Sequence, residues 1–330
     1  MHYSRMDGIV RRRVARAMKP GGPEVLSVEV EEMPPLQAHQ VLVRVQAAGL
    51  NHVESLVRSG GYPRPFPFPY AAGFEGAGRV EAVGSSITIP IGARVCWTAV
   101  FGSCATHVAA PAAFLAVVPD EVPLEKAAAL AHAAVTAEGL VRHCPLPAGA
   151  CAVVWGAAGS VGRQLVCRLV DRGVQVIGLA SADRVEAVRA LGARPVDRGS
   201  DDVGAVVREE TSGRGAAAVF DPIGAATFER SLALLAPRGC LVTYGQLSGP
   251  VPPIDLMQLM QNGSVFVTRY GPHAGVVAPN ELAPITAEAL RQSRTRPLSA
   301  GVAHRFALDR VADAYRAMEA GARGKVLVLP

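Results

Sequence analysis

The feature of this sequence that most limits its fold is an apolar strand that runs directly into a glycine turn and then into a helix. The stretch reads Val153-Val154-Trp155-Gly156-Ala157-Ala158-Gly159-Ser160-Val161-Gly162. Glycine at position 159 lets the backbone approach a phosphate, glycine at 162 lets the helix pack on the strand, and the free amides at the helix start favour an anion. Ala157 stands where the commonest form of the motif has its first glycine. The stretch therefore predicts a dinucleotide site whose phosphates contact Ala158, Gly159, Ser160 and Val161.

The segments that follow this turn alternate between strand and helix patterns. Apolar strand patterns at 152–155, 174–179, 217–220 and 240–244 are separated by helical patterns at 161–172, 183–191 and 225–234. Gly173 and Gly192 follow the first two helical patterns, as glycine commonly does at a helix end. A glycine pattern alone is weak evidence, but repeated strand and helix units of this length predict an α/β fold with a doubly wound parallel sheet.

The two ends of the chain differ from this alternating region. Short alternating runs at 25–30, 41–47 and 79–83 predict a β-rich N-terminal third. Residues 60–69 carry four prolines at every second position, which predicts a loop because proline removes backbone donors and fixes φ. The chain ends on an apolar strand pattern, 325–330, which must pair elsewhere. We therefore expect two domains joined by short crossings.

Composition excludes several classes of protein. The chain has 330 residues and half are hydrophobic, so two domains can each bury a core. The formal net charge is +5, and part of the excess lies in the N-terminal run of Arg11, Arg12, Arg13, Arg16 and Lys19. Because no basic stripe with interleaved aromatic residues continues beyond this run, we expect no nucleic-acid partner.

The cysteines and the apolar runs bear on the cellular compartment. The six cysteines are scattered without a CxxC pair, and read as small buried hydrophobes in a reducing environment. No signal-peptide pattern opens the sequence, and glycine, proline or charge interrupts the apolar runs before they reach membrane-spanning length. We therefore expect a cytoplasmic protein with no membrane partner.

The end of the second strand pattern selects between the two nicotinamide dinucleotides. A carboxylate at this strand tip would bind a ribose diol, whereas a hydroxyl group and an arginine suit a 2′-phosphate. Ser181 and Arg184 follow an uncharged tip, and Arg198 is a second candidate phosphate partner. These residues favour NADPH. The alternative is that Ser181 only caps a helix while Arg184 is solvated beside Asp183.

Taken together, the motifs resemble the zinc-independent quinone oxidoreductase branch of the medium-chain dehydrogenase/reductase superfamily, also called the zeta-crystallin-like reductases. The resemblance covers nearly everything from about Val14 to Pro330. It rests on the order and spacing of residues 41–51, 58–62, 73–78, 127–130, Thr136-Ala137, 156–162, 220–224 and 267–269.

The resemblance implies a domain layout and a set of site residues. A GroES-like substrate domain would comprise residues 14–125 and 270–330, a Rossmann NADPH-binding domain residues 126–269, and a basic N-terminal extension residues 1–13. A homodimer is implied, with sheet edges near 257–268 in contact. Asn51 and Tyr62 would line the reacting end and Thr136 would lie beside the nicotinamide. Ser181 and Arg184 fall on 2′-phosphate positions, and further cofactor contacts fall on Tyr244, Gly245 and Arg269. Asp197-Arg198 departs from the commoner Tyr-Arg pair, so the arginine of that pair is kept and its aromatic residue is replaced by Asp197.

The resemblance also implies that the protein needs no zinc. Zinc-dependent members carry cysteine and a Gly-His-Glu run in these stretches, whereas here Asn51 stands at the cysteine position and Phe74 at the histidine position, leaving Glu75 alone. The four-cysteine structural lobe is missing as well. His52 and His107 remain candidate polar cleft residues, although a lone histidine more often bonds only to a neighbour.

These features favour NADPH-dependent, metal-free hydride transfer to a quinone. The task of the protein is then positioning and donation of a hydrogen bond to the developing oxyanion, for which Asn51 and Tyr62 are the candidates. Tyr62 could instead be a packing lid. An enoyl reductase acting on α,β-unsaturated carbonyls, including one of natural-product biosynthesis, is a second hypothesis. Residues around Tyr62, Pro272 and His273 would set the acceptor shape. A third hypothesis is a cofactor-binding protein with little catalysis and a structural or RNA-linked role.

Overall fold

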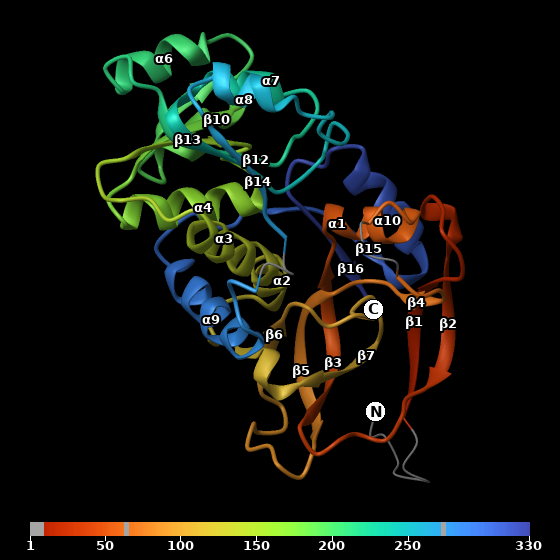
Figure 1. Ribbon diagram of the computed structural model, residues 1–330. Coiled ribbons are helices and arrows are strands. Elements are labelled where there is room, and N and C mark those ends of the chain that lie inside the picture. The colour runs from red at the N-terminus through yellow and green to blue at the C-terminus, as the bar shows by residue number, and fades with distance from the viewer. Residues whose placement is uncertain (1–9, 63–65, 272–274) are drawn as a thin grey trace. The chain divides into compact units, whose positions relative to one another are not determined.

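The computed structural model describes residues 10–62, 66–271 and 275–330, and these form two compact units (Figure 1). The first unit comprises the described residues up to His132 together with Pro279–Arg294 and Gly301–Pro330. The second unit comprises Ala133–Ala278 and Thr295–Ala300. Boundaries were expected at 126 and 269, and the short segment 295–300 was not expected in the second unit.

The second unit is built on a parallel sheet. Its strands lie in the order β11-β10-β9-β12-β13-β14, and every pair along this order is parallel. Numbered from β9, this is the order 3-2-1-4-5-6 of a Rossmann fold, which confirms the predicted doubly wound sheet. The strands are β9 (Cys151–Trp155), β10 (Gln175–Ala180), β11 (Arg194–Asp197), β12 (Ala216–Asp221), β13 (Leu235–Thr243) and β14 (Phe266–Arg269).

One helix leads into the parallel sheet, and each of the others connects two of its successive strands. They are α3 (Ala131–His143), α4 (Ser160–Asp171), α5 (Val185–Arg189), α6 (Val203–Glu210), α7 (Phe228–Ala233) and α8 (Leu256–Gln261). The predicted helix 183–191 begins instead as one turn of 3-10 helix at Ala182–Arg184 and continues as α5. The core between strands and helices includes Val153, Trp155, Ile177, Leu179 and Leu241.

The first unit is β-rich, as the N-terminal patterns predicted. One sheet has the order β2-β1-β4, and the other has the order β15-β16-β3-β5-β6-β8 with β7 also paired to β3. The strands of the first sheet are β1 (Arg11–Ala17), β2 (Leu26–Glu32) and β4 (Tyr70–Ala71). Those of the second are β3 (Gln40–Gly49), β5 (Glu75–Val83), β6 (Arg94–Trp97), β7 (His107–Pro111), β8 (Leu115–Val117), β15 (Val302–Ala307) and β16 (Lys325–Leu329).

The predicted N-terminal extension needs a correction at its inner end. Arg11, Arg12 and Arg13 were placed in this extension, but they form the start of β1 and pair in register with Glu32, Glu31 and Val30. Two of their side chains also form ion pairs across the strands, Arg11 with Glu32 and Arg12 with Glu31. The inner end of the basic run is therefore part of the folded sheet, where carboxylates on β2 balance the charge of Arg11 and Arg12.

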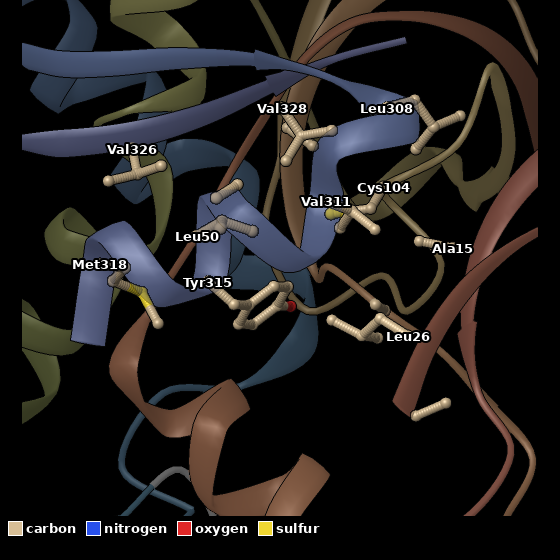
Figure 2. Close-up of a cluster of buried hydrophobic side chains, with 14 of the residues drawn as sticks. Ala15, Leu26, Leu50, Cys104, Leu308, Val311, Tyr315, Met318, Val326 and Val328 are labelled. Carbon is tan, nitrogen blue, oxygen red and sulfur yellow. The ribbon is translucent and has the colours of Figure 1, made fainter. Parts of the chain in front are cut away.

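The helices of the first unit are α1 (His52–Ser59), α2 (Leu124–Ala128), α9 (Leu282–Gln292) and α10 (Val311–Glu319). Figure 2 shows Val311, Tyr315 and Met318 projecting from α10 into a buried cluster that includes Leu50 and Val326. The final strand, β16, supplies Val326 and Val328 to this cluster and pairs with β3. The C-terminal segment thus completes a core that the N-terminal strands begin.

Candidate functional site

The glycine turn of the second unit has the geometry that a nucleotide phosphate requires. Gly156 directly follows β9 with φ 64°, and Gly159 precedes α4 in an extended conformation. A Cβ on Gly162 would collide with the carbonyl oxygen of Gly156, so glycine there is needed for the helix to pack. A Cβ on Gly159 would meet only the Gly156 oxygen, at 3.1 Å, and the amides of Ser160 and Val161 open the helix. The turn therefore fits a dinucleotide phosphate.

Three arginines lie around this turn. Arg184 donates from Nη2 to the carbonyl oxygen of Ala158 at 2.8 Å, and Arg163 donates from Nε to the same oxygen at 3.0 Å. The exposed Arg198 follows β11, and its backbone N–H donates to Ala180 at the end of β10. Within the described residues, no carboxylate forms an ion pair with any of these three arginines. This set of donors suits a phosphate, which fits NADPH.

The hydroxyl group of Ser181 has a partner in this structure. Its Oγ donates to Oδ1 of Asp183 at 2.7 Å, in the turn that leads into α5. Ser181 therefore lies with Arg184 and Arg198 at the ends of β10 and β11, as the nucleotide assignment needs. To bind a 2′-phosphate, its hydroxyl would have to donate to a phosphate oxygen in place of Asp183.

A second group of predicted cofactor residues lies at the ends of β13 and β14. Arg269 donates from Nη1 to the carbonyl oxygen of Gly245 at 2.7 Å. Tyr244 directly precedes Gly245 in the sequence. A Cβ on Gly245 would collide with the carbonyl oxygen of Pro222, so glycine is required there. Arg269 also lines a cavity of about 500 Å³ together with Thr243, Gln246 and Val267. Thr136, the remaining cofactor residue proposed for this unit, lies half-buried in α3.

In the first unit, Asn51 is part of a buried polar cluster. Its Oδ1 accepts a hydrogen bond from Nζ of Lys325 at 2.7 Å, and its Nδ2 donates to Oε1 of Glu75 at 2.9 Å. Lys325 and Glu75 form an ion pair, and Lys325 is 5% and Glu75 0% exposed. The second oxygen of Glu75 accepts the backbone N–H of His132 at 2.8 Å. Asn51 is therefore held by charged groups at both ends of its amide.

Tyr62 lies in an aromatic group and not in this polar cluster. Its ring contacts Phe66 edge to face with 6.2 Å between centroids, and both side chains pack partly buried against the core of the first unit. Phe66 in turn contacts Tyr70 and Phe101. This packing agrees with the alternative hypothesis of a lid, and the described residues do not bring Tyr62 to the Asn51 cluster. Pro272 and His273 lie outside the described residues.

A buried carboxyl group adjoins Asn51 on α1. Glu54 accepts the backbone N–H of Asn51 at 2.9 Å and the hydroxyl of Tyr315 at 2.6 Å. Burial raises the pKa of the Glu54 carboxyl to about 7, against the lowering effect of these two hydrogen bonds and of Lys325. Burial also lowers the pKa of His132 to about 3, and the charge of Lys325 adds to this effect. His132 is therefore neutral around neutral pH, whereas Glu54 is divided between its protonated and ionised forms there.

The remaining candidate residues are His107, His52 and the residues at the positions of the zinc ligands. His107 is buried and its Nε2 lies 3.0 Å from Oε2 of Glu81, so it serves the sheet. His52 is exposed at the start of α1. Phe74 packs edge to face on His132 with 4.8 Å between centroids. In the described part of the chain, no three His, Cys, Asp or Glu residues come together as a metal-binding group.

Comparison with known proteins identifies the family. The model described as "Alcohol dehydrogenase GroES-like domain" matches residues 37–137, and the model described as "Zinc-binding dehydrogenase" matches residues 161–282. A quinone oxidoreductase of Pseudomonas aeruginosa is 36% identical over 320 residues, which are 94% of this chain and 97% of that protein. The chain belongs to the quinone oxidoreductase branch of the medium-chain dehydrogenase/reductase superfamily.

Other members of the superfamily extend the comparison. A 2-haloacrylate reductase from a Burkholderia species is 33% identical over 262 residues, which cover 76% of this chain and 78% of that protein. A mycobacterial protein whose structure was solved in complex with NADPH has a TM-score of 0.84 at 34% identity, covering 96% of this chain and 100% of that chain. The predicted family is confirmed, and the first unit contains the GroES-like domain that the resemblance implied. Among the described residues, no helix is both long and apolar enough to cross a bilayer.

Sequence reasoning missed three residues of this reductase that the structure brings to its candidate sites. Arg163, Glu54 and Lys325 were not singled out. The signal for Lys325 was a charged residue opening the otherwise apolar strand 325–330. Glu54 had no signal, because its hydrogen bond to Tyr315 joins residues far apart in the sequence. Arg163 had no signal beyond its place directly after Gly162.

Proposed function

We propose that this protein catalyses NADPH-dependent hydride transfer to a quinone. The observation that carries the proposal is the glycine turn of the second unit together with Arg184 and Arg198 beside it, which no carboxylate of the described residues pairs with. A dinucleotide with a 2′-phosphate satisfies both features, because the turn accepts the pyrophosphate and the guanidinium groups can pair with the extra phosphate. The relatives named as quinone oxidoreductases and the NADPH complex of a related structure support this choice.

The reaction has a simple balance. A quinone, NADPH and one proton yield a hydroquinone and NADP⁺, and the bound cofactor supplies the hydride. The chain must hold the acceptor, exclude side reactions and donate a hydrogen bond to the oxygen that gains negative charge. We assign that donation to Asn51, while Tyr62 covers the acceptor as part of the aromatic group with Phe66. Thr136, Tyr244, Gly245 and Arg269 contact the cofactor in this proposal.

A second acceptor class is favoured by one specific relative. The 2-haloacrylate reductase takes its name from an activated carbon-carbon double bond conjugated to a carboxyl group. Conjugate hydride addition to an enone also places negative charge on an oxygen, so the same donor would serve. Reduction of α,β-unsaturated carbonyls is therefore the alternative function.

The assembly we propose is a homodimer in the cytoplasm that joins the edges of two parallel sheets. Strand β14 forms one edge of the sheet, and Phe266 on it is 55% exposed. On the adjacent α8, Leu256, Met257 and Met260 are 77%, 52% and 55% exposed. An edge strand with exposed apolar neighbours is an expected site of association. Sedimentation of wild type and of Phe266→Glu tests this, since the variant should sediment as a monomer.

A substrate panel tests the function. Purified protein is supplied with NADPH and then with either 1,4-quinones or α,β-unsaturated ketones and acids, and oxidation of NADPH is followed by absorbance. Faster turnover of quinones supports the leading proposal, and faster turnover of enones replaces it with the alternative. Tight retention of NADPH without turnover of either class would indicate a cofactor-binding protein with little catalysis.

A further inference from the structure

Two strand pairings bring Asn51, Glu75 and Lys325 together from distant parts of the chain. On one side of β3, Gly49 pairs with Glu75 of β5, and on the other side Gly49 pairs with Leu327 of β16. Antiparallel register then puts Lys325, two residues before Leu327, opposite Asn51, two residues after Gly49. The meeting of these three side chains is thus set by sheet register and not by a flexible loop.

The three side chains form a closed ring of contacts. Lys325 contacts both Glu75 and the amide oxygen of Asn51, and the amide nitrogen of Asn51 donates to Glu75. The ion pair is shielded from solvent, so water cannot replace either partner as it can in a surface ion pair. A Cβ on Gly49 would lie 2.6 Å from Oε1 of Glu75 and 2.7 Å from Cε of Lys325, so glycine makes the room for the ring.

The ring permits one orientation of the Asn51 amide. If the amide were flipped, its nitrogen would face the Lys325 ammonium and its oxygen would face the Glu75 carboxylate, and both contacts would be repulsive. One N–H of Nδ2 is used by Glu75, and the other faces the carbonyl oxygen of Gly49 across 3.4 Å. That second bond is long, so an acceptor oxygen can replace it.

We propose that Lys325 is a positioning residue for reduction by this protein. Its ammonium holds the amide oxygen of Asn51, which fixes the direction of the second N–H and polarises it toward the acceptor oxygen that gains negative charge. Glu75 is the counter-charge that lets the ammonium remain buried. A hydrogen bond to an oxyanion strengthens when its donor is polarised by a charge in a site from which water is excluded. The proposal rests on the proposed function, because it needs Asn51 to face the acceptor.

The rival explanation is that the ion pair only stabilises the first unit. Lys325→Met removes the charge but leaves Glu75 unpaired, so it will lower thermal stability under either explanation. The double variant Glu75→Gln with Lys325→Met removes both charges with little change of side-chain volume. The new amide can accept the backbone N–H of His132 with its oxygen and donate to the oxygen of a flipped Asn51 amide, so stability should return. The rate of hydride transfer, measured in a single turnover by stopped flow with a 1,4-quinone, then separates the two explanations.

The proposal predicts that hydride transfer falls about tenfold in Lys325→Met and stays low in the double variant, although thermal stability recovers. KM for NADPH should change little, and the exposed Lys19→Met should behave as wild type. Recovery of the rate together with stability would overturn the proposal.

A second experiment uses an Asn51→Ala background. Adding Lys325→Met there should lower the rate by less than about twofold, because the ammonium acts through Asn51. A full further tenfold loss would also overturn the proposal. A wild type that reduces neither quinones nor enones would refute the proposed function itself, whereas an active wild type with an unchanged Lys325→Met would refute only this inference.

Discussion

Arg163 and Arg184 donate hydrogen bonds to the same atom, the carbonyl oxygen of Ala158 in the glycine turn, at 3.0 and 2.8 Å. The two guanidinium groups therefore lie close together, and both burial and the charge of Arg184 lower the pKa of Arg163. Like charges at this separation repel, and a shared neutral acceptor offsets only part of that repulsion. Their arrangement produces a positive potential beside the turn, which is the condition an additional phosphate group needs.

The first prediction concerns this potential. Arg184→Ala should weaken NADPH binding by about ten- to a hundredfold, because a charge-assisted hydrogen bond contributes roughly 1.5 to 3 kcal/mol. NADH carries no phosphate there and should bind with little change. Isothermal titration with both nucleotides measures this, and the preference for NADPH should shrink at high salt. Arg198→Ala combined with Arg184→Ala is the fuller test, and the two effects should be coupled. Equal weakening of NADPH and NADH would mean that Ser181 and Arg184 only begin a helix.

The second prediction concerns the turn itself. Gly159→Val should weaken NADPH binding by at least about a hundredfold, because its branched side chain occupies the space of the pyrophosphate and crowds the Gly156 oxygen. The fold should survive, as monitored by circular dichroism. A matched control is Gly204→Val in α6, where added atoms meet only side-chain ends of Arg208 and Asp202. Unchanged affinity in Gly159→Val would show that the phosphate binds elsewhere.

The third prediction is a pH dependence of stability due to Glu54. Because burial raises its folded pKa to about 7 from an ordinary value of 4.5, the folded state holds the proton more tightly than the unfolded state. Its contribution is fully present below about pH 4.5 and is lost as the pH rises through about 7, a total of about 3 kcal/mol. Glu54→Gln should therefore gain stability relative to wild type across this window. Urea unfolding at several pH values measures it, and parallel profiles for the two proteins would refute the assignment.

The fourth prediction concerns zinc. The purified protein should contain no stoichiometric zinc and should keep its activity in a chelator. Asn51 and Phe74 stand at the ligand positions, and the ammonium of Lys325 already neutralises Glu75. Elemental analysis and assays in EDTA test this. Tightly bound zinc whose removal abolishes activity would contradict it.

The sequence was sufficient to predict the parallel sheet and the glycine turn, because both are encoded in local periodicity and in residues close along the chain. The position of Lys325 beside Asn51 could not be predicted, since it depends on the register of β16 against β3, and the two strands lie at opposite ends of the chain. The same limit applied to Arg11–Arg13, whose alternation is weak and whose strand is defined by carboxylates on β2. The hydrogen bond of Ser181 to Asp183 was likewise decided by a side-chain choice that spacing does not determine.

The most direct measurement of the central claim is the initial rate of hydroquinone formation from a 1,4-quinone with NADPH and with NADH, under identical conditions and without added metal. We predict turnover with NADPH, and a kcat/KM at least about tenfold lower with NADH because the contact of Arg184 with the 2′-phosphate is lost. No hydroquinone with either nucleotide would contradict the proposed reaction, and equal or faster turnover with NADH would contradict the assignment of the cofactor.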